Sequence, residues 1–405
     1  MRPLAAGRAL LIAAPFLALA LVTKLPSLAF VHREPDEVIY WAVAQHLDDY
    51  GLYTLRGAPI LKKLPRAMYD RPLFHHPPLY PALLVPFVQR DARSEAVVIS
   101  WLGHALAIFS VAWIGLHLHA RLGGSSRAFS ALAIPLAGVA LDPVFVHTAR
   151  KLWIDAPVAG LSALAVALTV AALARPNGRR WLLLAAGAAL GIAGLAKLPG
   201  LLLAPICALL VVTARRPWPA RIGDLACVSL PALLVVAPWF WVFYARYGTL
   251  LPAWTAPSPE LLERFPMMAA AVAKPWHSFA TKLAVVQPLF ALGLGAFAWS
   301  AMRGEQRTAL GWIVLGWLAG LLVALTYLGA TRFSFQMRFL SPLCAAIYLI
   351  PLAIPAWYRA PNARWLRAGA LVAIAWATFG AAPYLLNGRP DELVGFAERL
   401  GLVRF

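Results

Sequence analysis

Long apolar blocks, separated by short polar connections, run along nearly the whole chain of 405 residues. Most have about 17 to 25 residues, the length that an α-helix needs to cross the hydrocarbon core of a bilayer. The predicted spans are residues 9–30, 95–118, 128–147, 155–174, 181–196, 198–214, 224–244, 284–301, 308–330, 339–357 and 365–386. The pattern therefore predicts an all-α, polytopic membrane protein with about 11 transmembrane helices. The first block could also be a cleaved signal peptide, but we favour a retained helix because many further spans must be oriented after it.

The composition supports this class. Hydrophobic residues make up 61% of the chain and charged residues 13%, against about 25% charged residues in soluble domains. This excludes a soluble protein of this length. The net charge of +19 would favour a nucleic-acid partner if the basic residues formed one hydrophilic face, but they lie in short loops between apolar blocks. We therefore expect a lipid bilayer around the chain and no nucleic acid.

The signs of the loop charges predict an orientation. If the N-terminus is cytoplasmic, the segments that face inward contain only arginines as charged residues, apart from Asp224 and Glu305. This is the distribution that the positive-inside rule requires. The large hydrophilic loop 31–94 then lies outside, where a second outer segment at about 245–283 could cover it. We expect one integral membrane domain over residues 1–386, with its functional loop at 31–94, and a short extracytoplasmic tail at 387–405.

The outer loop begins with a predicted interfacial helix that starts near Pro35. Proline at a helix start loses no needed N–H, and the carboxylates of Asp36 and Glu37 favour the positive end of the helix dipole. Tyr40 lies four residues after Asp36, on the same helix face. Two interpretations remain open here. The acids either cap a helix that lies on the membrane, or Asp36 is a carboxylate directed into a site at the outer membrane surface.

A rigid corner is predicted further along the loop, in the segment 74–81. Paired prolines follow His75 and His76 there and exclude a continuous helix. The corner either turns the chain back toward the second span or presents His76 and Tyr80 to a ligand. A histidine pair without further ligand spacing is weak evidence for a metal.

Four more charged side chains stand where predicted spans begin or end on the outer side. They are Arg150, Asp155, Lys197 and Arg338. Charges at such positions can serve as interfacial anchors, but an isolated cation between two apolar segments, such as Lys197, usually faces a cavity or a partner. Together with Asp36, these residues are expected to form a group of positive and negative side chains at the same depth, near the outer surface of the membrane. Such a set fits a lipid-linked phosphate, because cations neutralise the leaving phosphate while a carboxylate activates an incoming hydroxyl.

At these residues the sequence resembles the GT-C glycosyltransferase superfamily, in particular the bacterial branch akin to protein O-mannosyltransferases and aminoarabinose transferases, with its RgtA/B/C/D-like members. The resemblance covers about residues 10–355. The matching segments are Asp36-Glu37 with Tyr40 and Ala44, residues 76–80, residues 150–155, residues 194–197, and Arg338-Phe339 with Pro342.

The resemblance implies an inverting hexosyl- or pentosyltransferase in the bacterial inner membrane. It would move a sugar from a polyprenyl-phosphate donor to an acceptor on the extracytoplasmic face, either a cell-envelope glycan, a glycolipid such as lipopolysaccharide, or a protein hydroxyl. The resemblance implies that Asp36 is the catalytic base, with Glu37 supporting its helix, and that Asp155 shapes a catalytic or acceptor pocket. It implies donor phosphate binding by Lys197, Arg338 and, more weakly, Arg150. It also implies a substrate pocket with Tyr40, His76 and Tyr80.

The chain departs from the pattern of the superfamily at two points. Phe339 stands where a tyrosine usually follows the arginine, and no soluble outer domain follows the last span. No cofactor is required by the sequence. A divalent metal is an option for which Glu34, His75 and His76 are the candidate ligands.

Two other classes of protein compete with an enzyme. A transporter or flippase of a lipid-linked or anionic solute would also need outer cations, but transporters more often show repeated halves and charges at the midplane. A non-catalytic membrane scaffold would use Asp36 and Asp155 only as helix caps. The concentration of charge at one surface favours the enzyme.

Overall fold

The computed structural model describes the greater part of the chain, and every regular element in the described part is a helix. It covers residues 6–29, 35–56, 73–74, 76–122, 127–175, 179–248, 317, 338, 341–358 and 362–380. The described residues contain no β-strand. The predicted all-α class is confirmed. The spans predicted at 284–301 and 308–330, the segment 249–283 and the tail 387–405 lie outside the described residues, apart from Trp317.

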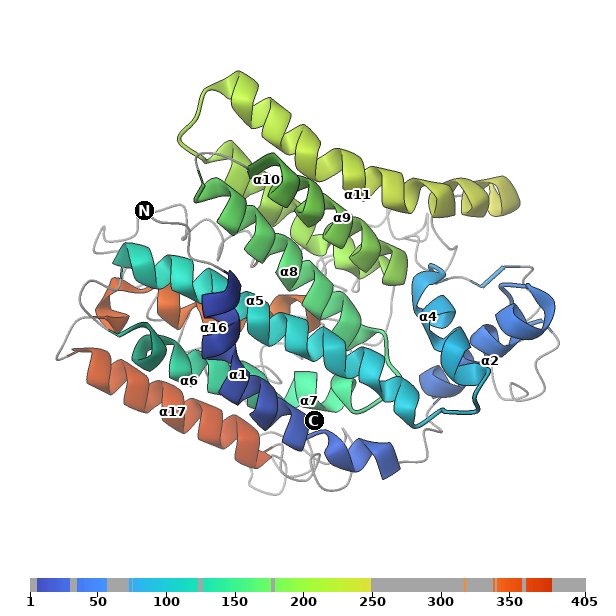
Figure 1. Cartoon of the computed structure of the whole chain (residues 1–405), viewed down its shortest axis with the longest axis horizontal. Coiled ribbons are helices and arrows are strands. Elements are labelled where there is room, and N and C mark those ends of the chain that lie inside the picture. Colours follow the sequence, from blue (N-terminus) through green and yellow to red (C-terminus); the bar gives the residue numbers. More distant parts are fainter. Residues whose placement is uncertain are drawn as a thin grey trace, which may run out of the picture.

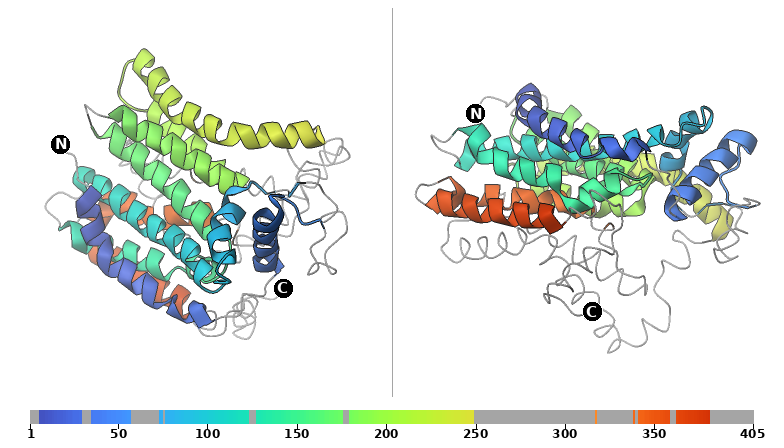
Figure 2. Two further views of the ribbon diagram at one scale, coloured as in Figure 1. Left: turned by 45° about the vertical axis from the view of Figure 1, so that its right-hand side comes forward. Right: turned by 90° about the horizontal axis from the view of Figure 1, so that it is seen from below.

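The long helices lie side by side in a row (Figure 1). Along this row α11 packs on α9, α9 on α8, α8 on α5, and α5 on α1 and α6, while α17 packs on α6. Their bounds are α1 Ala6–Val22, α5 Val98–Leu122, α6 Ala128–Leu141, α8 Asp155–Leu173, α9 Arg179–Ala196, α11 Trp218–Tyr247 and α17 Asn362–Gly380. Helix α16 (Ser341–Leu349) packs against α5, α6 and α8 and so adds a second layer to the row (Figure 2).

Four described helical stretches are long and apolar enough to cross a bilayer, and a bent pair makes a fifth. They are Ala6–Ala29, Glu95–Leu122, Asp155–Leu173, Trp218–Tyr247 and the pair Ala128–Leu141 with Pro143–Ala149. Each coincides with a predicted span. Glu95–Leu122 continues beyond the predicted end at residue 118, and Trp218–Tyr247 extends beyond both predicted ends, because basic and aromatic residues at the interface continue the helix.

Three predicted spans were wrong in form, since each is broken where we expected a continuous helix. The span 128–147 bends by 47° between α6 and α7 (Pro143–Ala149). Pro143 prevents a continuous helix there, and the Asp142 carboxylate restarts it by accepting the Phe145 N–H at 2.9 Å.

The other two broken spans also divide at prolines. The span 198–214 is a 3₁₀ turn, η4 (Leu198–Leu203), followed by the short helix α10 (Ala204–Val212). The span 339–357 becomes α16 followed by the 3₁₀ turns η6 (Pro351–Ala353) and η7 (Pro355–Trp357). Each proline removes a backbone donor that a continuous helix needs.

The two ends of the helix row differ in chemistry. At one end, α2 (Pro35–Tyr50) and α4 (Leu79–Val88) of the predicted outer loop pack against each other (Figure 1). At the other end, α5 and α8 finish and α9 and α11 begin, and there the Arg216 guanidinium donates to the Arg175 carbonyl at 3.5 Å. Arginines therefore gather at the end opposite α2 and α4, as the predicted orientation requires.

The outer loop is also attached to α11. The Tyr247 hydroxyl donates to the Leu73 carbonyl at 2.7 Å and accepts from the Leu73 N–H at 3.1 Å. Tyr53 places its ring edge-on to Trp239, at 5.8 Å between ring centroids. These contacts bring α11 and the loop together at the same end of the row as α2 and α4.

Helices α5 and α8 cross at two glycines. A Cβ atom on Gly160 would lie only 2.0 Å from the Gly103 carbonyl oxygen, and one on Gly103 would lie 2.3 Å from the Pro157 nitrogen. Small residues allow such close backbone approach, which is how helices associate tightly in membranes. The crossing fixes Asp155, the first residue of α8, relative to α5.

We predict that Gly160→Ala destabilises the protein by about 1–3 kcal/mol, because the methyl group forces apart two backbones that cannot yield. The matched control is Gly223→Ala in α11, where an added Cβ has no neighbour within 4 Å. Thermal unfolding of the purified protein in detergent measures both. Equal stability of the two variants would contradict the crossing as described.

Candidate functional site

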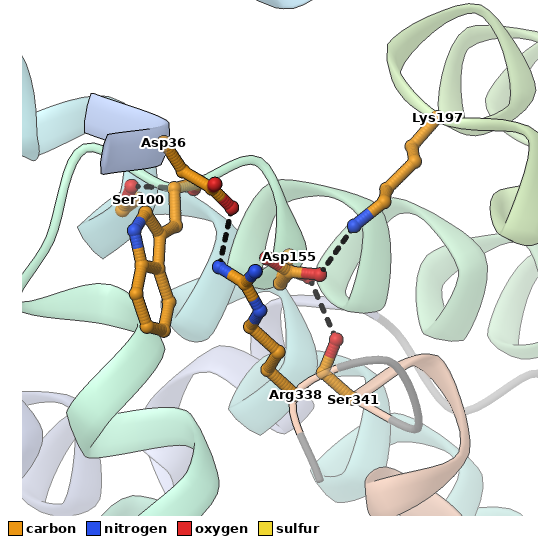
Figure 3. A network of polar contacts seen from close by, with 7 residues as sticks. Asp36, Ser100, Asp155, Lys197, Arg338 and Ser341 are labelled. Carbon is orange, nitrogen blue, oxygen red and sulfur yellow. Dashed lines mark hydrogen bonds and ion pairs between the residues drawn. The ribbon is translucent and has the colours of Figure 1, made fainter. Parts of the chain in front are cut away.

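Two ion pairs lie together at the end of the helix row that carries α2 and α4 (Figure 3). The Arg338 guanidinium binds the Asp36 carboxylate at 2.5 Å between Nη1 and Oδ2. The Lys197 ammonium binds the Asp155 carboxylate at 2.9 Å. Figure 3 shows the Asp155 and Arg338 side chains close to each other, between Asp36 and Lys197. Residues that are distant in the sequence thus form one mixed-sign cluster.

Helix ends position these four side chains. Asp36 lies in the first turn of α2, and Asp155 begins α8. Carboxylates are stabilised at such positions by the positive end of the helix dipole. Lys197 directly follows α9 and has an extended backbone. The Ser341 hydroxyl, at the start of α16, donates to the Asp155 carbonyl at 3.1 Å, so the starts of α8 and α16 are tied together.

The segment between α7 and α8 is anchored from two sides. The Ser100 hydroxyl contacts the carbonyl oxygens of Lys151 at 2.8 Å and Trp153 at 3.0 Å. The buried Glu37 carboxylate accepts the Leu152 N–H at 3.0 Å. Glu37 was expected to support its own helix, and this contact shows that it also fixes the neighbouring segment. The backbone of residues 151–153 is therefore held firmly beside the ion pairs.

Trp153 lies under two cations. Its ring is 4.4 Å from the Arg338 guanidinium carbon and 4.6 Å from the Lys151 ammonium. The π face attracts positive charge through its quadrupole. The ring thus links Arg338 with the segment between α7 and α8.

The chain is similar to known proteins in sequence and in fold. The family model described as dolichyl-phosphate-mannose-protein mannosyltransferase matches residues 75–242. ArnT from Cupriavidus metallidurans in the apo state is 19% identical to this chain over 95% of it and 73% of ArnT, with a TM-score of 0.55. The chain has the GT-C fold. The predicted resemblance to the GT-C superfamily is confirmed.

A second GT-C structure shares the fold at greater distance. The oligosaccharyltransferase of Archaeoglobus fulgidus, solved with a tethered acceptor peptide, is 13% identical, with a TM-score of 0.55. The match covers 98% of this chain but only 59% of that protein. No curated protein matches the chain by sequence.

The matched family region contains Asp155 and Lys197, whereas Asp36 and Arg338 lie outside it. The structure brings all four together. Arg150 is buried close by, and burial lowers its pKa. For Arg338, burial lowers the pKa, but the charges of Asp155 and Asp36 raise it more, so the pKa lies above its usual value. Arg338 is therefore a permanent cation beside Asp36 and Asp155.

The aromatic candidates pack on one another. Tyr40 meets Tyr80 edge-on at 5.2 Å and His76 at 5.9 Å between ring centroids. Phe74 lies edge-on to Tyr40 at 6.4 Å. Tyr40 and Tyr80 are almost fully buried. These rings form a small core under α2, so their first effect is to fix the helix that carries Asp36.

The metal candidates are only partly covered by the structure. Glu34 and His75 lie outside the described residues, and so does Phe339. Among the described residues, no three His, Cys, Asp or Glu side chains gather in a metal-binding group.

The sequence did not predict Trp153, Ser100 or Ser341 as parts of the site, whereas Lys151 lies in the segment 150–155 that matches the superfamily. A lysine beside a tryptophan at a span end is typical of interfacial anchoring. The two serines lie in or next to apolar helices and carry no local signal. Only the tertiary contacts show that these two serines bind the backbone next to the ion pairs.

The Lys197–Asp155 pair generates a stability prediction. Both side chains are nearly inaccessible, with 11% and 5% of their area exposed. Lys197→Met leaves a buried carboxylate without this partner and should lower the free energy of unfolding by about 3–5 kcal/mol. The double variant Lys197→Met/Asp155→Asn should recover most of that loss. Thermal unfolding in detergent tests this, and a double variant as unstable as the single one would contradict the coupling.

Proposed function

We propose that the protein is an inverting glycosyltransferase that takes a sugar from a polyprenyl-phosphate donor. The observation that carries the proposal is the direct pairing of Asp36 with Arg338, beside the Asp155–Lys197 pair. A carboxylate that can accept a proton and a cation that can bind phosphate thus share one contact. Transfer of a sugar from a lipid phosphate to a hydroxyl uses a base for the hydroxyl proton and a cation for the leaving phosphate.

The proposed step is a single displacement. The acceptor hydroxyl oxygen attacks the anomeric carbon, and its proton passes to the Asp36 carboxylate. The bond from that carbon to the phosphate oxygen breaks, and the electron pair leaves with the polyprenyl phosphate. Arg338 binds the phosphate as its charge increases. Attack opposite the leaving group inverts the anomeric configuration.

Other side chains take supporting roles in the proposal. Lys197 holds Asp155 in place and adds positive charge on the side of the donor phosphate. Asp155 shapes the acceptor side, and Arg150 adds positive potential. Tyr40, His76 and Tyr80 support the substrate side of α2 from the core beneath it.

The lipid donor is supported by the structures that share the fold. One structure of ArnT from Cupriavidus metallidurans is bound to undecaprenyl phosphate, with 20% identity, coverage of 95% of this chain and 78% of ArnT, and a TM-score of 0.54. An AglB structure from Archaeoglobus fulgidus holds a dolichol-phosphate. We carry the lipid-phosphate class over to this chain. The acceptor is a cell-envelope glycan, a glycolipid or a protein hydroxyl.

The proposed location is the bacterial inner membrane, with the site on the extracytoplasmic face. The separation of charge along the bundle supports this. Arginines gather at one end, where α8 stops and α9 begins, and both acid–base pairs lie at the other. The positive-inside rule places the arginine end in the cytoplasm.

Asp36→Asn should lower the rate of sugar transfer by about 10²–10⁴-fold, the usual contribution of a general base. The assay uses a radiolabelled polyprenyl-phosphate sugar with the purified protein in proteoliposomes. The matched control is Asp49→Asn, an exposed acid later in α2, which should retain full activity. Unchanged transfer by Asp36→Asn would remove Asp36 from the mechanism. Lipid that crosses sealed vesicles chemically unchanged would favour a flippase.

A Tyr40 variant tests whether Tyr40, instead of Asp36, acts as the general base. Burial raises the pKa of Tyr40 well above its usual value, and the charges of Asp36 and Asp155 raise it further. Because the raised pKa keeps the hydroxyl protonated across the neutral range, Tyr40 cannot accept the proton. Tyr40→Phe should therefore keep transfer within about 10-fold of wild type at pH 7, less than a general base contributes. A loss as large as that of Asp36→Asn would contradict this assignment.

A further inference from the structure

Helices α9 and α11 run parallel and in step from the arginine-rich end of the row, opposite α2 and α4, toward the site (Figure 1). A Cβ atom on Gly187 would lie 2.1 Å from the Val228 carbonyl oxygen, and one on Gly191 would lie 2.9 Å from that of Ala232. Small residues allow such close approach of helices in membranes. The two helices therefore meet along one tight seam, in a register that the glycines fix.

Two arginines lie where this seam begins, one on each helix. Arg180 stands seven residues before Gly187, and Arg221 stands seven residues before Val228. Seven residues make almost two helical turns, so each arginine lies on the face of its helix that carries the contact. Arg180 and Arg221 are therefore level with each other at the mouth of the α9–α11 seam.

The turn before α11 brings a third arginine to the same place. The Arg216 guanidinium donates to the Arg175 carbonyl, just after α8, at 3.5 Å. The Arg221 guanidinium donates to the carbonyl oxygens of Arg216 at 2.7 Å and Val212 at 2.8 Å. A carbonyl oxygen fixes a guanidinium but does not cancel its charge as a carboxylate would. The backbone thus holds two cations in place next to the seam.

The acids of this end do not contribute to its described surface. By sequence, the connections that face inward under the predicted orientation contain two acids, Asp224 and Glu305. Asp224 lies within α11 and only 5% of it is exposed. Glu305 lies outside the described residues. Arg180 and Arg215, in contrast, are exposed, so the described surface at the mouth of the seam is basic.

Two exposed tryptophans place this basic surface at the depth of lipid headgroups. Trp181 at the start of α9 is 57% exposed, and Trp218 at the start of α11 is 61% exposed. Tryptophan is enriched at the interface between membrane and water. The Arg221 guanidinium lies 4.9 Å from the centre of the Trp218 ring. Leu184, one turn after Arg180 on the same face of α9, is exposed and continues the surface as an apolar one.

We propose that the mouth of the α9–α11 seam binds an anionic phospholipid, with its phosphate at Arg180, Arg216 and Arg221 and an acyl chain along Leu184. Guanidinium groups bind phosphate oxygens through charge-assisted hydrogen bonds, and basic pockets between membrane helices suit anionic headgroups. The apolar surface beside the arginines favours a lipid over a free phosphate ion. Under the proposed orientation, this lipid belongs to the cytoplasmic leaflet. The inference does not depend on sugar transfer.

The positive-inside rule alone explains why arginines lie at this end of the bundle. It does not require that arginines from two helices and a turn meet at one seam, or that backbone carbonyls fix their guanidinium groups. A binding measurement separates a lipid site from a general preference for this side of the membrane.

Native mass spectrometry of the purified full-length protein in detergent resolves the lipid-free and lipid-bound species. The probes are phosphatidylglycerol and phosphatidylcholine with the same acyl chains, and each dissociation constant is obtained by titration. The wild-type protein should bind phosphatidylglycerol about 10-fold or more tightly than phosphatidylcholine, because only the first headgroup has a net negative charge. Inorganic phosphate, added as a competitor at equal concentration, should displace little of the lipid.

Arg180→Gln and Arg216→Gln should each weaken binding of phosphatidylglycerol by about 5-fold and leave phosphatidylcholine within about 2-fold of wild type. The double variant should bind the two lipids with nearly equal affinity. Arg180 is exposed, so its variant should keep the thermal unfolding midpoint of the wild type. The matched control is Arg127→Gln, which removes an exposed arginine at the same end, just before α6, and should bind both lipids as the wild type does.

Four results would overturn the inference. They are equal wild-type affinity for the two lipids, wild-type affinity in both single variants, an equal loss in Arg127→Gln, and displacement of the lipid by inorganic phosphate. The last result would indicate a site for a free ion. The proposed function is tested separately, because the transfer assay with Asp36→Asn does not involve these arginines.

Discussion

Charge burial at one end of an apolar bundle is the constraint on which the structure depends. An isolated ion in a medium of low dielectric constant costs far more than a neutral residue, so each buried charge here requires a compensating partner. The buried Asp155 pairs with Lys197, and Arg338, whose side chain is 15% exposed, pairs with the more exposed Asp36. Because the partners come from four separate segments, the pairs also join α2, α8, the end of α9 and the start of α16. The contacts that form the candidate site therefore also hold these segments of the fold together.

The backbone is subject to the same constraint, because its polar groups must also be satisfied within the apolar bundle. Glycines let α5 and α8 approach closely, which places the start of α8 against Ser100 and the fixed segment 151–153. The break between α6 and α7 is offset by Asp142, whose carboxylate also accepts the Tyr348 hydroxyl at 2.5 Å. The interruption between α6 and α7 is therefore matched by side-chain contacts, as a bilayer requires.

The sequence predicted the helical class and the positions of the longest spans, because apolar length and arginine-rich loops are local signals. It also predicted that Asp36, Asp155, Lys197 and Arg338 would lie at one depth, and the structure places them in contact. It did not predict the bend at Asp142, since the apolar pattern continues across it. Nor did it predict which acid meets which base, or that two cations would meet at Trp153, because such pairings depend on packing between distant segments.

The most direct test is an experimental structure of the protein in a lipid nanodisc with undecaprenyl phosphate. The account predicts that the phosphate lies at the α2 and α4 end of the bundle, within about 3 Å of the Arg338 guanidinium, the distance of a charge-assisted hydrogen bond. A phosphate bound at the arginine-rich end, or on the lipid-facing side of α11 away from Asp36, would contradict it.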